Sequence, residues 1–321
     1  MSAITPPVPG SIPLVVLAGP TASGKTALAL ALAARFGGEI VGADSRQIYR
    51  LLDIGTAKPT SAERARVPHH LLDVVWPDEP YTLAQYQADA VAAIADVAAR
   101  GRLPLLVGGT GLYVRAVVDG LAIPAVPPQP ALRAELEALA VAEGVAALHA
   151  RLAALDPAAA ASSDPANPRR LIRALEICLV TGRPVSEQRG TRPTPYRPLF
   201  LGLDTERSIL YGWADRRVDA MLAAGFVAEV EGLAARGYRW DLPALSSLGY
   251  REIGAALRGE LTLPAAVERL KRATHAYIRR QLTWFRPDPR IHWLDAAAPD
   301  RTTAAVSLVA DWQAAHSTQN D

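Results

Sequence analysis

Leu14-Val-Val-Leu-Ala18, continued by Gly19-Pro-Thr-Ala-Ser-Gly24-Lys25-Thr26, is the most informative segment of this 321-residue chain. The apolar run at residues 14–18 is typical of a buried parallel strand. Residues 25–36 contain good helix formers and stop before Gly37-Gly38, which predicts a helix with a glycine C-cap. The residues between them fit G-x-x-x-x-G-K-[ST] in the strand-loop-helix context that a phosphate-binding loop requires. The segment therefore predicts a site for a di- or triphosphate.

The chemistry of this loop follows from its residue types. Glycines let successive backbone amides point inward as an anion nest at a helix N-terminus. Lys25 adds a mobile positive charge, and Thr26 offers a hydroxyl to Mg²⁺. The candidate diphosphate- or nucleotide-binding residues are Gly19, Pro20, Thr21, Ala22, Ser23, Gly24, Lys25 and Thr26.

The rest of the chain continues a strand and helix alternation. Apolar runs predict strands at residues 39–44, 103–107, 199–203 and 291–294, and helices at 82–100, 207–223, 226–236, 250–257 and 263–285. This alternation predicts an α/β fold with a P-loop NTPase-like parallel sheet flanked by helices.

A change of composition marks an insertion. Residues 123–130 contain four prolines, and residues 182–198 contain four prolines and four arginines. Proline interrupts helices and sheets, so both segments read as boundaries. Residues 131–181 between them are typical of helices only. We expect a catalytic core of residues 1–123 and 199–321, with a helical insertion at 124–198.

Composition narrows the class of protein. The chain is 50% hydrophobic, has a net charge of +2 and contains one cysteine, Cys178. A single cysteine excludes an internal disulfide and a cysteine-based zinc cluster, and fits a reducing, cytoplasmic location. Residues 1–13 do not resemble a signal peptide, and no charge-free apolar run of about 18 residues occurs, so we expect no membrane association.

Polar residues follow two predicted strands near the loop. Asp44 ends the strand at 39–44, and Thr110 follows Gly108-Gly109 after the strand at 103–107. Parallel α/β sheets bind ligands at the carboxyl ends of their strands, so these residues and the loop should converge there. Asp44 could be a metal ligand, a general base or a helix N-cap. The strand at 103–107 lacks the aspartate that P-loop NTPases use for Mg²⁺.

Seven ordered blocks resemble the tRNA dimethylallyltransferases over residues 14–294. They are Gly19-Pro-Thr-Ala-Ser-Gly-Lys-Thr26, Asp44-Ser-Arg-Gln47, Asp53-Ile-Gly-Thr-Ala-Lys-Pro59, Pro68-His-His70 with Leu72-Asp73, Gly108-Gly-Thr-Gly-Leu-Tyr113, Asn167-Pro-Arg-Arg170 and Leu248-Gly-Tyr-Arg251. Members of this family isopentenylate the adenosine immediately 3′ of the anticodon. Here Trp213 stands where many members carry a further arginine, and Ser246-Ser247 replace bulkier residues.

The resemblance implies that the loop holds the diphosphate of dimethylallyl diphosphate with Mg²⁺ at Thr26. It implies catalytic roles for Lys25, Asp44, Thr110 and Arg217, with Asp44 as the base that removes the proton of the adenine amine. Diphosphate is then the leaving group, and no hydrolytic water has to be positioned. This accounts for the absence of the Mg²⁺-binding aspartate after the strand at 103–107.

The resemblance also implies a tRNA anticodon stem-loop as partner and a monomeric enzyme. Adenine must leave the base stack to reach the allylic carbon, so the protein must hold a single-stranded loop. The implied tRNA contacts are Asp44, Ser45, Arg46, Gln47, Thr110, Arg133, Arg169, Arg170, Leu171, Ile172, Arg173, Ser246, Ser247, Leu248, Gly249, Tyr250 and Arg251. The helical insertion would then clamp the anticodon loop.

Structural readings compete at several positions. Arg169, Arg170 and Arg173 share a helix face with Glu176 and could form ion pairs there. The charged residues of the helix at 263–285 could be solvated or could bind RNA backbone. Buried positions are expected for Tyr277, Trp284, Trp293 and Cys178, and a structural role rather than metal binding for His69 and His70.

Two other functions fit the loop. An ATP-dependent kinase would use the helical insertion as a lid and its arginines to neutralise the transferred phosphate. A non-enzymatic RNA-binding protein would keep the loop for stability.

Overall fold

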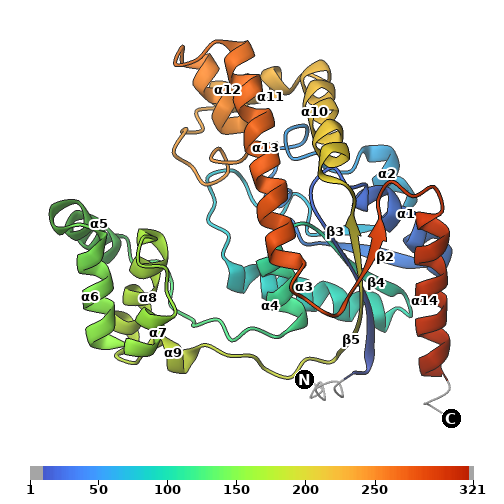
Figure 1. Ribbon diagram of the computed structural model, residues 1–321, viewed down its shortest axis with the longest axis horizontal. Helices are drawn as coiled ribbons and strands as arrows, with labels where there is room; N and C mark the ends of the chain where they lie inside the picture. The colour runs from blue at the N-terminus through green and yellow to red at the C-terminus, as the bar shows by residue number, and fades with distance from the viewer. Residues whose placement is uncertain (1–9, 318–321) are drawn as a thin grey trace. The chain divides into compact units, whose positions relative to one another are not determined.

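The computed structural model describes residues 10–317. The prediction that residues 1–13 are not a signal peptide falls mostly on residues 1–9, which lie outside the described part. Within residues 10–317, six strands form one sheet in the order β3-β2-β4-β1-β5-β6 (Figure 1). Every neighbouring pair is parallel. The strands are β1 (Ile12–Ala18), β2 (Gly38–Gly42), β3 (His69–His70), β4 (Leu103–Val107), β5 (Tyr196–Asp204) and β6 (Ile291–Asp295).

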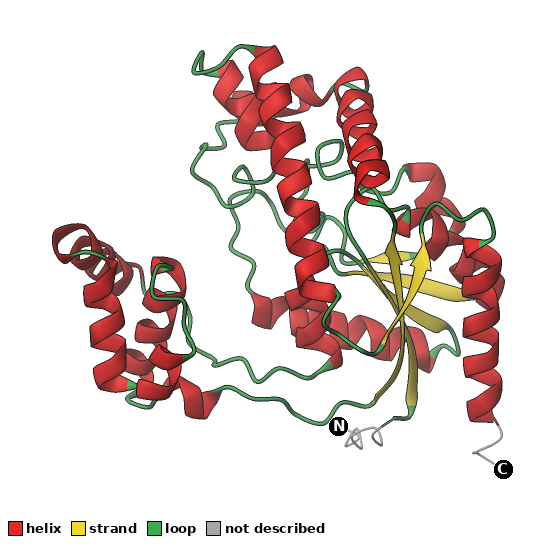
Figure 2. Cartoon of the chain, viewed as in Figure 1, coloured by secondary structure: helices red, strands yellow, loops and turns green. Residues whose placement is uncertain are grey.

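The described chain divides into two compact units, residues up to 118 with residues from 194 on, and residues 119–193. Figure 2 shows that the sheet belongs to the first unit. The helices of that unit are α1 (Lys25–Phe36), α2 (Ser61–Arg66), α3 (Leu83–Ala99), α4 (Gly111–Val118), α10 (Arg207–Ala223), α11 (Phe226–Ala235), α12 (Tyr250–Leu257), α13 (Leu263–Phe285) and α14 (Arg301–Ser317). The insertion contains α5 (Pro130–Glu143), α6 (Val145–Leu155), α7 (Pro157–Ala161), α8 (Pro168–Thr181) and α9 (Val185–Gln188).

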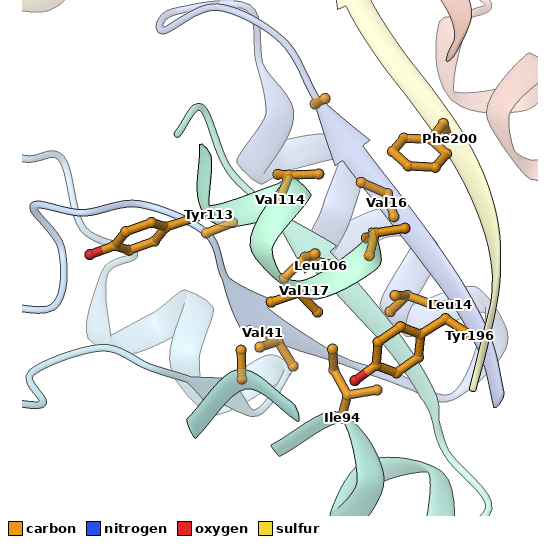
Figure 3. Close-up of a cluster of buried hydrophobic side chains, with 14 of the residues drawn as sticks. Leu14, Val16, Val41, Ile94, Leu106, Tyr113, Val114, Val117, Tyr196 and Phe200 are labelled. Atoms are coloured by element: carbon orange, nitrogen blue, oxygen red, sulfur yellow. The ribbon is translucent and has the colours of Figure 1, made fainter. Parts of the chain in front are cut away.

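Strand β1 is buried on both faces, which explains its uninterrupted apolar sequence. Leu14 and Val16 pack with the helices α3 and α4, and Figure 3 shows Val16 and Leu106 beside Val114 and Val117 of α4. The alternate residues, Val15 and Leu17, pack with α1 and α14. Because successive side chains of β1 point to opposite faces of the sheet, the strand packs against the helices on both faces.

The sheet register brings three loops to one edge. Leu17 of β1 pairs with Val107 of β4, which in turn pairs with Gly42 of β2. The loops after these three strands begin within one or two residues of the paired positions. The phosphate-binding loop, the Asp44 turn and the loop at 108–110 consequently start side by side.

The insertion has its own hydrophobic core. Leu136 of α5, Leu148 and Leu152 of α6, and Leu175 and Cys178 of α8 are buried together. Its first and last residues run together, because Leu121 forms an antiparallel bridge with Thr191 and the amide of Arg192 donates to the carbonyl of Gly120 at 2.8 Å. The contact boundaries, 119 and 193, fall slightly before the expected 124 and 198.

The α/β parallel fold is confirmed, as are the expected core strands and helices to within a few residues. The structure adds α2, α4, α14 and the two-residue strand β3, which the sequence patterns did not predict. The predictions for two tryptophans were wrong: Trp284 is 40% exposed and Trp293 is 36% exposed. Trp284 lies at the surface over Gly111, and Trp293 lies on the edge strand β6. No helix of residues 10–317 is long and apolar enough to cross a membrane.

Candidate active site

The phosphate-binding loop has the backbone of an anion nest. Gly19 and Gly24 have φ angles of 138° and 86°, and Ala22 has a φ of 65°. A Cβ atom on Gly19 would lie 2.6 Å from the carbonyl oxygen of Leu203, so a side chain is excluded there. Gly24 caps α1 without a side-chain hydrogen bond. The first turn of α1 therefore keeps backbone donors and the positive end of its dipole for an anion.

Two cations and one carboxylate are electrostatically coupled at this loop. Burial, reinforced by the nearby charge of Arg217, lowers the pKa of Lys25 to about 7, while Asp44 opposes the shift. Burial also lowers the pKa of Arg217, again against the influence of Asp44. The ammonium of Lys25 donates to the carbonyl of Pro20 at 2.6 Å. Positive charge on two half-buried side chains, with one partly compensating carboxylate, favours binding of a further anion.

Asp44 lies in a turn tied to Thr110. Its Oδ1 accepts the amide of Arg46 at 2.8 Å, and the Thr110 hydroxyl oxygen accepts the amide of Ser45 at 3.1 Å. The amide of Thr110 donates to the carbonyl of Ala43 at 3.1 Å. A Cβ atom on Gly108 would lie 2.0 Å from that same carbonyl oxygen, so glycine permits this close approach of the two loops. Asp44 and Thr110 are thus held as one unit.

A cavity of about 440 Å³ joins the two halves of the site. The residues that line it include Thr21 and Ala22 of the loop, Asp44, and Arg217 of α10. Tyr277 of α13 also lines it and hydrogen bonds with Thr110, and burial raises the pKa of its phenol. Apolar side chains form another part of the cavity wall, namely Val218, Met221, Phe226 and Leu270.

Most of the core residues expected to contact tRNA line this cavity. They are Asp44, Ser45, Arg46, Ser246, Ser247, Leu248, Gly249 and Arg251. Gln47 instead donates to the carbonyls of Thr56 and Ala57 at 3.0 and 3.1 Å, and the buried Tyr250 donates its hydroxyl to Glu229 at 2.6 Å. These two side chains stabilise the neighbouring 53–57 turn.

The insertion candidates divide into three kinds. Arg133 donates through Nε and Nη2 to Glu176, each at 2.8 Å, and Arg173 pairs with the same carboxylate. Although burial alone would raise it, these bonds lower the pKa of Glu176 to about 2. Arg169 and Arg170 are exposed. Leu171 and Ile172 lie in the insertion core, where their side chains are covered.

Candidate metal ligands are few. In the part of the chain that the structure describes, no group of three or more His, Cys, Asp or Glu residues could hold a metal ion. His69 Nδ1 lies 2.7 Å from the carbonyl of Val67, and His70 Nε2 lies 2.8 Å from Glu39. These contacts agree with the structural role expected of the histidine pair. Thr26, the expected Mg²⁺ ligand, is exposed at the start of α1.

The sequence patterns did not predict the roles of two residues at the site. Tyr277 was expected in the core but forms part of the cavity wall. Gln281, a buried amide on α13, was not singled out. Both lie on a helix whose charged pattern concealed the inward-facing polar positions, and only the packing of α13 against the loops identifies them.

The fold and the site define a P-loop-like α/β protein in which an anion nest adjoins a cavity that contains a carboxylate. Comparison with known proteins gives the family. Residues 47–288 match the IPP transferase family model, and residues 12–73 match the isopentenyl transferase model. The chain is 56% identical over 301 residues to the tRNA dimethylallyltransferase of Roseiflexus sp. (strain RS-1), covering 94% of this chain and 99% of that protein. The chain belongs to the tRNA dimethylallyltransferase family and is a prenyl-transferring enzyme.

Solved structures agree. The tRNA isopentenylpyrophosphate transferase of Bacillus halodurans is 40% identical, with a TM-score of 0.72 and coverage of 96% of this chain and 98% of that chain. A eukaryotic dimethylallyltransferase, captured acting on tRNA, is 27% identical, with a TM-score of 0.80 and coverage of 95% and 80%. These likenesses support the prenyl-transfer reading and not the kinase alternative.

Proposed function

We propose that this protein transfers a dimethylallyl group from dimethylallyl diphosphate to the exocyclic amine of the adenosine 3′-adjacent to the anticodon in tRNA. The observation that carries the proposal is the single cavity lined both by loop residues, Thr21 and Ala22, and by Asp44 and Arg217. A kinase requires a site for the phosphate donor and a site for the acceptor, and it does not require an apolar wall between them. Here the carboxylate shares its cavity with a wall of apolar side chains suited to a prenyl group.

The donor diphosphate would bind at the loop. The amides at the start of α1 and the side chains of Lys25 and Arg217 would hold its oxygens. Negative charge grows on the diphosphate as the carbon–oxygen bond breaks, and these groups stabilise that charge more strongly than they stabilise the ester. The low pKa of Lys25 means that the incoming anion would draw a proton onto it.

The acceptor adenine would lie against Asp44 and Thr110. Its exocyclic nitrogen attacks the C1 carbon of the dimethylallyl group, the C1–O bond breaks with both electrons leaving on diphosphate, and Asp44 takes the proton from nitrogen. The amine is a weak nucleophile because its lone pair is delocalised into the ring, so removal of the proton must accompany bond formation. Thr110, anchored by Ser45 and Tyr277, would orient the base.

The apolar wall has a chemical purpose in this reaction. Positive charge develops on the allylic carbon, and water in the cavity would capture it. Val218, Met221, Phe226 and Leu270 would exclude that water and contact the methyl groups of the donor.

Magnesium fits the residues present. Mg²⁺ commonly takes one or two protein oxygens and completes its shell with water and substrate phosphates, so the exposed hydroxyl of Thr26 suffices as a protein ligand. When bound, the ion would neutralise charge on the departing diphosphate.

The helical insertion would bind the anticodon stem-loop through Arg169, Arg170 and the two arginines on Glu176. The side chains of Arg133 and Arg173 remain 37% and 34% exposed while Glu176 fixes their orientation. As the family resemblance implies, the enzyme would act as a monomer in the cytoplasm, where tRNA is available.

The test is transfer of radiolabelled dimethylallyl from its diphosphate to an unmodified anticodon stem-loop. We expect label in the RNA and release of one diphosphate per transfer. A matched stem-loop with guanosine in place of the target adenosine should remain unlabelled. Absence of transfer by folded protein, or phosphoryl transfer from ATP without RNA, would contradict the proposal.

A further inference from the structure

One buried amide on α13 connects the two loops of the site. Gln281 is 5% exposed. Its Oε1 accepts the backbone amide of Thr21 at 2.8 Å, and its Nε2 donates to the carbonyl of Gly109 at 2.9 Å. Thr21 belongs to the phosphate-binding loop, and Gly109 immediately precedes Thr110. A single side chain therefore bonds to both sides of the proposed reaction centre.

The contact with the second loop leaves no spare room. A Cβ atom on Gly109 would lie 2.1 Å from Nε2 of Gln281, and one on Gly111 would lie 1.9 Å from the Trp284 ring. Two glycines thus let α13 approach the loop at residues 108–111 closely. The distance between this loop and α13 is fixed by the close contact of Gly111 with Trp284 and by the hydrogen bond of Gln281 with Gly109.

The bonds also have a fixed direction. A backbone amide can only donate and a carbonyl can only accept, so the carboxamide of Gln281 can satisfy both loops in one orientation only. A second consequence concerns the nest: the Thr21 amide already has a partner and is not available to an anion. The diphosphate would have to use the amides from Ala22 onward, among which the Ser23 amide already donates to the carbonyl of Pro20 at 3.4 Å.

We propose that Gln281 is a positioning residue that sets the distance and orientation between the diphosphate-binding loop and the Asp44–Thr110 turn. This inference rests on the proposed function, because it assigns the two loops to donor and acceptor. Gln281 touches neither the diphosphate nor the base in this assignment; it acts through Thr21 and Gly109. Its contribution is to the geometry of in-line attack, where a displacement of about 1 Å costs about 100-fold in rate.

Two substitutions test the proposal. Gln281→Met keeps the length of the side chain and removes both hydrogen bonds. Gln281→Glu keeps the acceptor for Thr21 but loses the donor for Gly109 until the carboxyl group is protonated. We expect kcat for dimethylallyl transfer to fall about 10- to 100-fold in both variants near pH 8, whereas the Kd for the stem-loop changes less than about twofold.

The pH dependence separates positioning from general stability. Burial favours the neutral form of the new glutamic acid, so lowering the pH restores an O–H donor to Gly109. The activity of Gln281→Glu relative to wild type should therefore recover between about pH 8 and pH 6. The ratio for Gln281→Met should stay constant. As a control, Ile94→Ala in the α3 core should lower the melting temperature without changing the kcat of the folded fraction.

A measurement on the wild type stands apart from any variant. Residue-resolved amide exchange should find Thr21 protected without ligand, and inorganic pyrophosphate should slow exchange from Ala22 to Thr26 while leaving Thr21 unchanged. Rapid exchange at Thr21, or variants whose kcat per folded molecule equals that of wild type, would overturn the role of Gln281. Wild-type transfer activity would still hold in that case, so failure of the proposed function would be seen separately.

Discussion

At the scale of single residues, Asp44 acts in two ways whose consequences can be separated, through one hydrogen bond and through its charge. Its Oδ1 accepts the Arg46 amide, which shapes the turn, and its charge acts on Lys25 and Arg217. An amide at this position could keep the hydrogen bond and lose the charge. Asparagine is therefore the informative replacement.

We expect Asp44→Asn to lower kcat by about 10²- to 10⁴-fold, which is the range for loss of a general base. Single-turnover transfer to the stem-loop measures it. The fold should persist, since the Arg46 amide keeps its acceptor. Pyrophosphate affinity should hold or increase slightly, because a negative charge near the anion is removed. Turnover close to that of wild type would show that Asp44 is not the base.

Lys25 gives a prediction about stability and binding together. Its folded pKa of about 7 lies below the ordinary 10.5, so the unfolded chain binds the proton more tightly. The free energy of unfolding should therefore rise as pH increases from about 7 to 10.5. Lys25→Met should remove this slope and stabilise the free protein near pH 7, on the order of a few kcal/mol, while abolishing efficient transfer.

Calorimetry of pyrophosphate binding checks the same assignment. At pH 8 the wild type should take up more protons on binding than Lys25→Met does, as read from the dependence of the enthalpy on buffer ionisation. Equal proton uptake by the two proteins would contradict the low pKa of Lys25.

At the scale of the elements, β2 is joined to its neighbours by a buried carboxylate. Glu39 is 5% exposed and is bonded by Arg100, which follows α3, and by His70 of β3. Hydrogen bonds from Arg100 lower the pKa of Glu39 to about 2 against the effect of burial. This explains a strand as short as β3: its two histidines are held by side-chain contacts as well as by the ladder.

Glu39→Gln should destabilise the fold by about 1–3 kcal/mol near pH 7. This is less than the ~3–5 kcal/mol typical when one partner of a buried pair is removed, because Arg100 is 44% exposed. The folded pKa lies below 4.5, so the wild-type advantage should be present above pH 4.5 and disappear as the pH falls towards about 2. Urea unfolding at several pH values measures it, and a constant difference would contradict the pairing.

The elements also show where the sequence was sufficient. Residues 14–36 and 103–107 carry periodic or continuous apolar patterns, and they form the expected strands and helix. Helix α4 was missed because Leu112-Tyr-Val-Arg-Ala-Val-Val118 is rich in β-branched residues typical of strands, and packing on the sheet overrides that preference. Strand β3 was missed because it consists of two histidines, which show no apolar pattern.

The site was predictable to the extent that strand ends were predictable. Asp44 and Thr110 follow strands that pair in register, so their proximity follows from the topology. The residues that α13 contributes, Tyr277 and Gln281, are distant in sequence from the loops and carry no motif. Which face of α13 turns toward the loops depends on packing at Gly109 and Gly111, and that packing is a property of the folded chain.

At the scale of the whole molecule, the insertion leaves and re-enters the core at neighbouring points. The hydroxyl of Thr194 donates to the carbonyl of Val118 at 3.1 Å, so the two ends of the core lie side by side. Each unit also has its own buried cluster. We therefore expect the core to fold when residues 119–193 are replaced by a short glycine-rich linker.

In that variant, pyrophosphate affinity should stay within about twofold of wild type, since the loop and Arg217 are intact. The KM for the stem-loop should rise about tenfold or more, because the contacts proposed between the insertion and the RNA phosphates would be lost. Calorimetry and steady-state transfer measure the two quantities. An unchanged KM would exclude the insertion from tRNA binding.

The lone thiol of Cys178 provides a probe for local opening of the insertion. It is 5% exposed on α8, among residues of the insertion core, and burial raises its pKa. A thiol reagent can reach Cys178 only when α8 opens. The rate of labelling therefore measures local opening of the insertion, and the sheet and its loops do not contribute to it. Slower labelling on addition of an anticodon stem-loop would give the energetic cost of that opening in the bound and free states directly.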